Sequence, residues 1–290
     1  MSLQLPMRRH ENDSLRKRRK GLYVLPSLFT SLNIAAGYYA IAQVLQGSAA
    51  EPEHFNNAAK AIGLAIMADG LDGRIARLTN TTSDFGRELD SLADVIAFGV
   101  APAVLAWTWG FRQLPPVWAP DLRSNLIHLG AIFTFVFMVA GAARLARFNI
   151  QTNPQPSNPG RPGRKYFVGM PIPAGAGAIS AVVHLFDGRP LISWWQSVVW
   201  LLYVSAAAFL MVSTWRFYSF KDLNFRSAHS YRLIIVMGLV FALGWLFSEY
   251  VLFALAFTYM MSGVVVRLSS FFRRHPNPPA PPLQSASELQ

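Results

Sequence analysis

Long uncharged apolar runs alternate with short basic segments along the whole chain. The first run, Leu22–Leu45, holds 24 residues without a charge, and about 20 apolar residues are enough to cross the hydrocarbon layer of a bilayer. The further apolar segments are Ala58–Leu78, Leu92–Phe111, Leu126–Phe148, Pro171–Phe186, Ile192–Thr214, Leu233–Phe247 and Val251–Val266. This pattern predicts an all-α polytopic membrane protein with eight spans, so that both termini lie on the same side of the membrane.

The first run has an alternative interpretation as a secretory signal, because the small residues Ser48, Ala49 and Ala50 follow it. The apolar region of a signal peptide is only about 7–15 residues long, however. The length of Leu22–Leu45 therefore favours a retained transmembrane helix.

The composition points the same way. Hydrophobic residues make up 52% of the chain and charged residues only 14%, whereas about a quarter of the residues of a soluble domain are charged. A water-soluble globular protein is therefore not expected. The chain contains no cysteine, which excludes disulfides, thiolate metal sites and cysteine nucleophiles.

The net charge of +11 could indicate either nucleic acid or an anionic membrane surface as a partner. With the N-terminus placed in the cytoplasm, 22 of the 26 Lys and Arg residues fall on inner segments and helix ends, and only Lys60, Arg112, Arg123 and Arg189 fall outside. The positive-inside rule therefore predicts that both termini face the cytoplasm. It also accounts for the charge without a nucleic-acid partner, while the basic N-terminal tail could contact anionic lipid headgroups.

Four aspartates interrupt the apolar pattern near one predicted membrane boundary. Asp69 and Asp72 lie three residues apart in the second span, and Asp90 and Asp94 lie four apart at the start of the third. Each pair therefore shares one helix face. The connection between the two helices is short, which makes them antiparallel, and at about 1.5 Å rise per residue the two pairs come level. We expect four carboxylates to converge near the cytoplasmic boundary.

Such a cluster of negative charges would be strongly repulsive, and most of the groups would have to bind protons. Divalent cations resolve the repulsion, and oxygen-only ligands suit Mg²⁺ or Mn²⁺. Two ions sharing the site would form a platform for phosphoryl transfer. The alternative is structural ion pairing with Arg74, Arg77 and Arg87, which leaves Gly70 and Gly73 unexplained. These glycines would allow a ligand to approach the backbone closely, and Arg77 could neutralise a pyrophosphate.

The spacing of these residues resembles the signature of the CDP-alcohol phosphatidyltransferase family: Asp69-x-x-Asp72-Gly73-x-x-Ala76-Arg77, then eight residues, then Gly86-x-x-x-Asp90-x-x-x-Asp94. The resemblance implies a six-helix core, a homodimer, and two divalent ions held by the four aspartates. It also implies that Asp94 is the general base that deprotonates the acceptor hydroxyl. The residues implied in nucleotide and phosphate binding are Asp69, Gly73, Ala76, Arg77 and Gly86.

Four other stretches resemble the serine-using branch of that family: Leu25–Asn33, Asp90–Ala103, Ala143–Asn149 and Tyr166–Ala174. Departures from the branch pattern are Ser27 for asparagine, Ala97 for serine, Met170 for leucine and Gly175 for alanine.

Within Ala143–Asn149, Arg144 and Arg147 lie three residues apart on one face, which suits a carboxylate or a second phosphate. Together with Asn149 they are the candidate acceptor-binding residues. The alternative for both arginines is anchoring at the membrane boundary by snorkelling.

The resemblance implies transfer of the phosphatidyl group of CDP-diacylglycerol to the hydroxyl of L-serine, which gives phosphatidylserine and CMP. The expected partners are CDP-diacylglycerol, L-serine, membrane lipids and a second copy of the chain. The expected location is the inner (cytoplasmic) membrane, with the active site facing the cytoplasm.

Two other interpretations stay open. The same fold could use glycerol 3-phosphate or an inositol phosphate as acceptor, with Arg161, Arg164 and Lys165 extending the basic cluster. A cation transporter could also use intramembrane aspartates, although such sites tend to lie near the bilayer midplane.

The expected organisation has four parts. A basic cytoplasmic tail covers 1–21, the catalytic transmembrane core covers 22–214, an additional C-terminal helix pair covers 215–270, and a disordered tail covers 271–290. The histidines, His184 among them, show no metal-ligand spacing and are expected at interfaces or in loops. Tryptophans such as Trp109, Trp194 and Trp195 are expected in the aromatic belts of the membrane.

Overall fold

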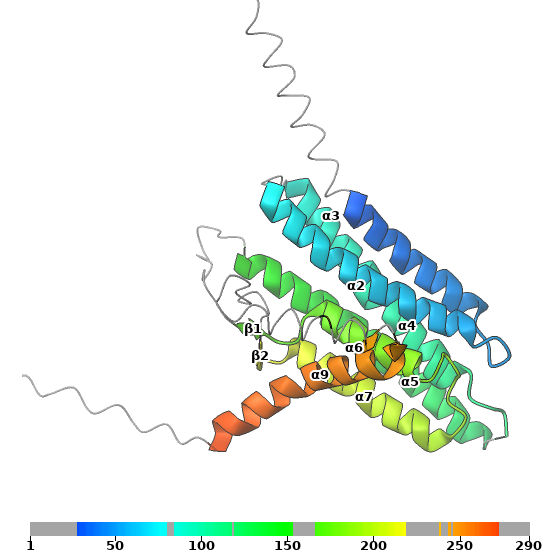
Figure 1. The fold of residues 1–290 in the computed structure, drawn as a ribbon. Coiled ribbons are helices and arrows are strands. Elements are labelled where there is room, and N and C mark those ends of the chain that lie inside the picture. The colour runs from blue at the N-terminus through cyan, green and yellow to red at the C-terminus, as the bar shows by residue number, and fades with distance from the viewer. Residues whose placement is uncertain are drawn as a thin grey trace, which may run out of the picture.

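The computed structural model describes residues 28–79, 84–117, 119–152, 166–218, 238, 243–244 and 246–272. Within these ranges, the side chains of residues 72–79, 84, 151–152, 166–167, 216, 218 and 270–272 are not described. Nearly all of the described chain is helical (Figure 1), as the sequence predicts.

The described part of the chain forms helices in the following order. They are the first helix, Leu28–Gln46, then α2 (Glu53–Thr79), α3 (Asp84–Asp94), the π-helical segment η1 (Val95–Val100), α4 (Ala101–Trp107), the π-helical segment η2 (Thr108–Arg112), α5 (Pro120–Thr152), α6 (Ile172–Leu185), α7 (Trp194–Val212) and α9 (Ser248–Phe272). The segments α3, η1, α4 and η2 form one continuous helical stretch.

Five helices in the described part of the chain are long and apolar enough to cross a membrane. They are Leu28–Gln46, Phe85–Arg112, Pro120–Ile150, Trp194–Val212 and Ser248–Ser269. Helix α6 is apolar but has only 14 residues. Large apolar side chains such as Phe135 and Leu202 are exposed along these helices, as expected where a surface faces lipid. The protein is therefore an integral membrane protein.

Five of the eight predicted spans fall on these five helices, whereas Ala58–Leu78 falls on α2 and Pro171–Phe186 on α6, which are not among them. The helix ends also differ. The third helical stretch begins at Asp84 instead of Leu92, and α9 extends beyond the predicted Val251–Val266 at both ends. Apolar runs mark the part of a helix that is buried in lipid, whereas backbone hydrogen bonding continues into the polar flanks. The predicted span Leu233–Phe247 lies mostly outside the described residues, and so does the start of the first span, residues 22–27.

The first helix packs closely on η1. A Cβ atom added at Gly37 would lie 2.9 Å from the Cα atom of Ala97, so glycine is required for the two backbones to approach this far. Small residues commonly permit such contacts between membrane helices, because apolar side chains gain little by leaving lipid. Asp94 immediately precedes η1, so this contact helps to set the position of its carboxylate.

At the other end of the bundle, Trp109 lies in the core. The sequence predicted this residue at the membrane interface. It is completely buried, its Nε1 donates to the Gly188 carbonyl at 3.1 Å, and its ring packs edge-on against Trp200 at a centroid distance of 5.2 Å. Burial is possible because the indole N–H finds an acceptor. Trp194 and Trp195 are exposed, and their place in an aromatic belt stays a prediction.

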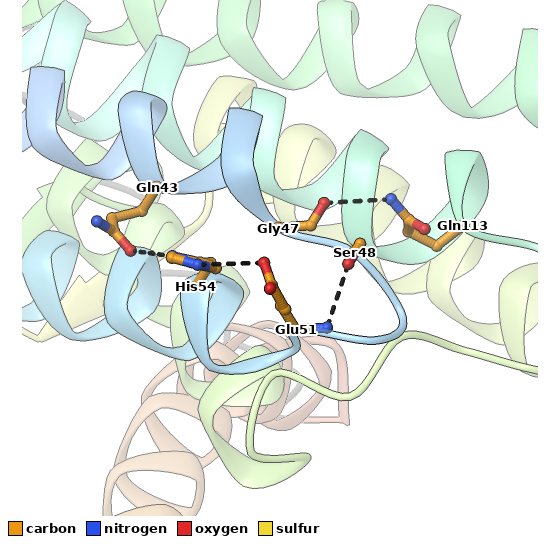
Figure 2. A network of polar contacts seen from close by, with 6 residues as sticks. All are labelled: Gln43, Gly47, Ser48, Glu51, His54 and Gln113. Carbon is orange, nitrogen blue, oxygen red and sulfur yellow. Dashed lines mark hydrogen bonds and ion pairs between the residues drawn. The ribbon is translucent and has the colours of Figure 1, made fainter.

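Polar contacts join the first helix, α2 and the end of η2 at this same end of the bundle (Figure 2). His54 Nδ1 lies 2.8 Å from Gln43 Oε1, and His54 Nε2 lies 3.6 Å from a carboxylate oxygen of Glu51. Gln113 Nε2 donates to the Gly47 carbonyl at 3.4 Å. These contacts fasten the hairpin between the first helix and α2.

A short antiparallel strand pair, which the sequence pattern did not predict, closes the other end. Strand β1 (Tyr166–Val168) pairs with β2 (Arg216–Tyr218) so that Phe167 opposes Phe217. Gly169, directly after β1, has φ +78°, and an added Cβ would lie 2.5 Å from the Met211 carbonyl oxygen. Glycine is therefore needed where the chain turns from β1 into α6.

Helix α9 runs obliquely across the other helices (Figure 1) and contacts α6 and β2. Its Tyr259 ring lies 5.8 Å from the ring of Phe217. At its first residue, Ser248 Oγ lies 2.9 Å from His184 Nε2, and Asn56 Oδ1 lies 2.6 Å from His184 Nδ1. His184 is thus a buried junction between α2, α6 and α9, and lies in a helix and not in a loop.

We predict that Gly37→Ala lowers the free energy of unfolding by about 1–3 kcal/mol, because the added methyl group forces the first helix away from η1. The matched control is Gly63→Ala in α2, where an added Cβ meets nothing within 4 Å. Removing a helical glycine there should be neutral or stabilising by about 0.5–1 kcal/mol. Denaturant or thermal unfolding in detergent micelles measures both, and equal stability of the two variants would contradict the packing account.

Candidate active site

The structure brings three of the four motif aspartates together. Asp69 comes from α2, and Asp90 and Asp94 come from α3; one carboxylate oxygen of each lies within 4.8 Å of the others. Asp94 is 8% exposed, whereas Asp69 and Asp90 are half-buried. Acids from α2 and α3 therefore meet at one point. The spacing of the aspartates and the short connection between the two helices predicted this convergence.

The other motif residues of α2 are placed only by their backbone. Asp72, Gly73, Ala76 and Arg77 occupy its last turns, and their side chains lie outside the described part of the structure. Gly86 lies in the first turn of α3 and is half-buried.

Asp94 ends α3, and the π-helical segment η1 follows directly. Widened helical turns of this kind are rare and occur frequently at functional sites. The Asp94 carboxylate accepts a hydrogen bond from Asn33 Nδ2 at 3.4 Å, and Asn33 is 1% exposed. Asn33 was not predicted as a site residue from the sequence. A polar amide within an apolar span could have indicated it, because polar side chains inside the membrane often have a function.

Arg144 on α5 supplies a positive charge next to this group. It is 7% exposed and lies within electrostatic reach of Asp94 and of the Tyr259 hydroxyl. Its guanidinium carbon lies 5.2 Å from the centre of the Phe148 ring. A buried charge must be compensated by partners, and here a carboxylate and an aromatic face contribute. Tyr259 was missed as a neighbour of the site, because it lies on α9, more than a hundred residues from the motifs.

The other two predicted acceptor residues have different partners. Arg147 Nη1 donates to the Val212 carbonyl at the end of α7, at 3.1 Å, a favourable position for a cation because carbonyl groups at a helix C-terminus carry partial negative charge. Asn149 Nδ2 donates to Ser91 Oγ at 2.8 Å and so joins α5 to α3. Of the two arginines, Arg144 is the one that faces Asp94.

A pocket of about 190 Å³ opens beside the aspartates. Its lining residues are Arg87, Glu88, Asp90, Ser91, Asp94, Leu145, Phe148 and Asn149. Pockets for drug-sized ligands usually measure about 300–1,000 Å³. This one therefore suits a small polar molecule.

The donor set determines which cation the acids could hold. Asp69, Asp90 and Asp94 offer only carboxylate oxygens, which are the ligands that Mg²⁺, Mn²⁺ and Ca²⁺ prefer. A divalent ion would also relieve the repulsion between the three negative charges. The group could therefore bind a divalent metal.

Comparison with known proteins covers most of the chain. The family model described as CDP-alcohol phosphatidyltransferase matches residues 23–211. The CDP-diacylglycerol–serine O-phosphatidyltransferase of Helicobacter pylori is 36% identical over 220 residues, which are 76% of this chain and 82% of that protein. Proteins of the same name from Mycobacterium leprae and Saccharomyces cerevisiae are each 36% identical, over 68% and 56% of this chain and over 59% and 56% of their own lengths. The family match ends within α7, before α9 begins.

We predict that Asp90→Asn weakens Mn²⁺ binding at least about tenfold, because it removes a charged ligand from the group. The loss of the free-ion signal in electron paramagnetic resonance measures the bound fraction. Asp121→Asn is the control, since Asp121 is exposed at the start of α5 and should leave the affinity unchanged. Equal affinity in Asp90→Asn and the wild type would exclude a metal site at these aspartates.

Proposed function

This chain belongs to the CDP-alcohol phosphatidyltransferase family, and we propose that it transfers the phosphatidyl group of CDP-diacylglycerol to the hydroxyl of L-serine. The products are phosphatidylserine and CMP. The observation that carries the proposal is the convergence of Asp69, Asp90 and Asp94 beside the buried Arg144. The relatives named for the serine reaction support the choice of acceptor.

Asp94 acts as the general base of the reaction. Its carboxylate takes the proton from the serine hydroxyl, and the serine oxygen forms a bond to the β-phosphorus of CDP-diacylglycerol. The bond from that phosphorus to the bridging oxygen breaks, and CMP leaves with the electron pair. Asn33 and Arg144 both neighbour this carboxylate, and hydrogen bonding and charge there orient it towards the hydroxyl.

Asp69, Asp72, Asp90 and Asp94 are the residues that would hold the metal, which we propose to be two Mg²⁺ or Mn²⁺ ions. When bound, such ions neutralise charge on the pyrophosphate and on the leaving CMP. Gly73, Ala76 and Gly86 would lie against the nucleotide, and Arg77 would face a phosphate. The side chains of Asp72, Ala76 and Arg77 lie outside the described residues, so their roles rest on the family motif.

The acceptor site is built around Arg144. Arginine matches the geometry of a carboxylate with two parallel hydrogen bonds, and a buried guanidinium holds such a group more strongly than an exposed one. Asn149 lines the pocket nearby, and Arg147 extends the basic face of α5. A pocket of about 190 Å³ is in keeping with an acceptor as small as an amino acid.

The distribution of basic residues predicts which side of the membrane the aspartates face. In the predicted topology, only Lys60, Arg112, Arg123 and Arg189 lie on the side away from the aspartates, so the positive-inside rule assigns the aspartate end to the cytoplasm. There the water-soluble serine and the membrane-bound donor can both reach it. We also infer that the protein acts as a homodimer in the inner membrane, as the family resemblance implies.

We predict that the purified protein releases CMP from CDP-diacylglycerol when L-serine is supplied. Glycerol 3-phosphate and inositol phosphate, each offered in turn with radiolabel, should not be incorporated into lipid. Incorporation of either one in preference to serine would contradict the proposed acceptor.

The same assay separates an enzyme from a cation transporter. Asp94→Asn should lower kcat by about 10²–10⁴-fold, the contribution of a general base, while most of the affinity for CMP is retained. Asp187→Asn, at the exposed turn after α6, is the control and should leave kcat unchanged. A transporter would show neither nucleotide binding nor CMP release even in the wild type.

A further inference from the structure

Asn33 has an unusual environment for a polar side chain within an apolar helix. Its side chain is 1% exposed, and Nδ2 donates to Asp94 Oδ1 at 3.4 Å. In the described part of the chain, Asn33 Oδ1 is buried without a hydrogen-bond partner. A buried acceptor left unpaired costs free energy, and such groups are rare in folded proteins. Stability therefore does not explain why an asparagine is present at position 33, and a functional role is the alternative.

The chemistry of the neighbour determines which way the amide faces. A carboxylate can only accept hydrogen bonds, so the amide nitrogen must face Asp94. The amide oxygen is then directed away from Asp94, at the far side of the same planar group. This oxygen is already shielded from water. A donor that reaches it in the substrate complex would not first have to displace a water molecule.

Three complementary groups therefore lie together beside the pocket, whose lining includes Asp94 but neither Arg144 nor Asn33. Asp94 is the base, Arg144 is a cation within electrostatic reach of it, and Asn33 Oδ1 is an unpaired hydrogen-bond acceptor. Serine carries three matching groups: a hydroxyl for Asp94, a carboxylate for Arg144, and an ammonium group that needs an acceptor oxygen. A hydrogen bond from a charged donor to a buried amide oxygen is about twice as strong as one between neutral groups.

We propose that Asn33 is a specificity-determining residue, whose Oδ1 accepts a hydrogen bond from the ammonium group of an amino-acid acceptor while its Nδ2 holds Asp94. This inference rests on the proposed function, because it assumes that the acceptor is an amino acid. It assigns the first helix a part in choosing the acceptor in addition to its packing on η1.

Two fragments of serine separate this role from a general effect on the base. Ethanolamine keeps the ammonium and hydroxyl groups and lacks the carboxylate, whereas 3-hydroxypropionate keeps the carboxylate and hydroxyl and lacks the ammonium. The experiment measures the KM for serine and the inhibition constants of both fragments as competitors of serine. Wild type is compared with Asn33→Leu, which is close to asparagine in shape and has no polar atoms.

Asn33→Leu should raise the KM for serine and the inhibition constant of ethanolamine by roughly 10- to 100-fold, the effect of losing a hydrogen bond to a charged group. The inhibition constant of 3-hydroxypropionate should stay within about twofold, because it has no ammonium group to lose. Gln43→Leu removes an amide from the same helix, ten residues away, where the side chain contacts His54. This control should leave all three constants unchanged.

Equal changes in all three constants would show that Asn33 only holds Asp94, and no change in any of them would show that it has no role; either result overturns the proposal. Failure of 3-hydroxypropionate to compete even at a thousandfold excess over the serine KM would also count against it.

The KM for CDP-diacylglycerol checks that the variant is folded, and Asn33→Ala replaces Asn33→Leu if it is not. A wild-type protein that makes no phosphatidylserine would overturn the proposed function and this inference together, whereas normal wild-type turnover with unchanged constants in the variant overturns the inference alone.

Discussion

The carboxylates clustered in this helical membrane protein repel one another, and the surrounding structure must compensate for that repulsion. Asp69, Asp90 and Asp94 bring oxygens within 4.8 Å of one another, next to helices whose outer surfaces are apolar. Ionised acids in such surroundings are costly unless they have partners. Arg144 approaches from α5 and Asn33 from the first helix, and an oxygen-only site can take a divalent cation. The same gathering of acids that is costly for folding makes the cluster able to bind a divalent metal, which the proposed reaction uses to hold the pyrophosphate.

The helices around the cluster hold it in place from several directions. Close contact between Gly37 and Ala97 seats the first helix on η1, directly after Asp94. Helix α9 lies beyond residues 23–211, the part that matches the family, yet it brings Tyr259 within electrostatic reach of Arg144. Its N-terminal end is attached to the rest of the bundle through Ser248 and His184. The helix that follows the shared core therefore approaches the side of the site where Arg144 lies.

Local periodicity explains which features could be predicted from the sequence. The spacing of Asp90 and Asp94 and the short connection to α2 were enough to expect acids from two helices at one point, because helix faces repeat every three to four residues. The contact of Asn33 with Asp94, the burial of Trp109 and the approach of Tyr259 to Arg144 could not be predicted in this way. Each depends on how helices distant in sequence are rotated against one another. The strand pair of β1 and β2 was also missed, since three-residue strands have too little alternation to be recognised.

The most direct test of the account is to locate the metal. Crystals grown with Mn²⁺ and CDP-diacylglycerol, measured at the manganese absorption edge, should show anomalous density bounded by the carboxylates of Asp69, Asp90 and Asp94. Density elsewhere, with these three acids instead paired to arginine side chains, would contradict a metal-held phosphatidyl donor and the transferase mechanism built on it.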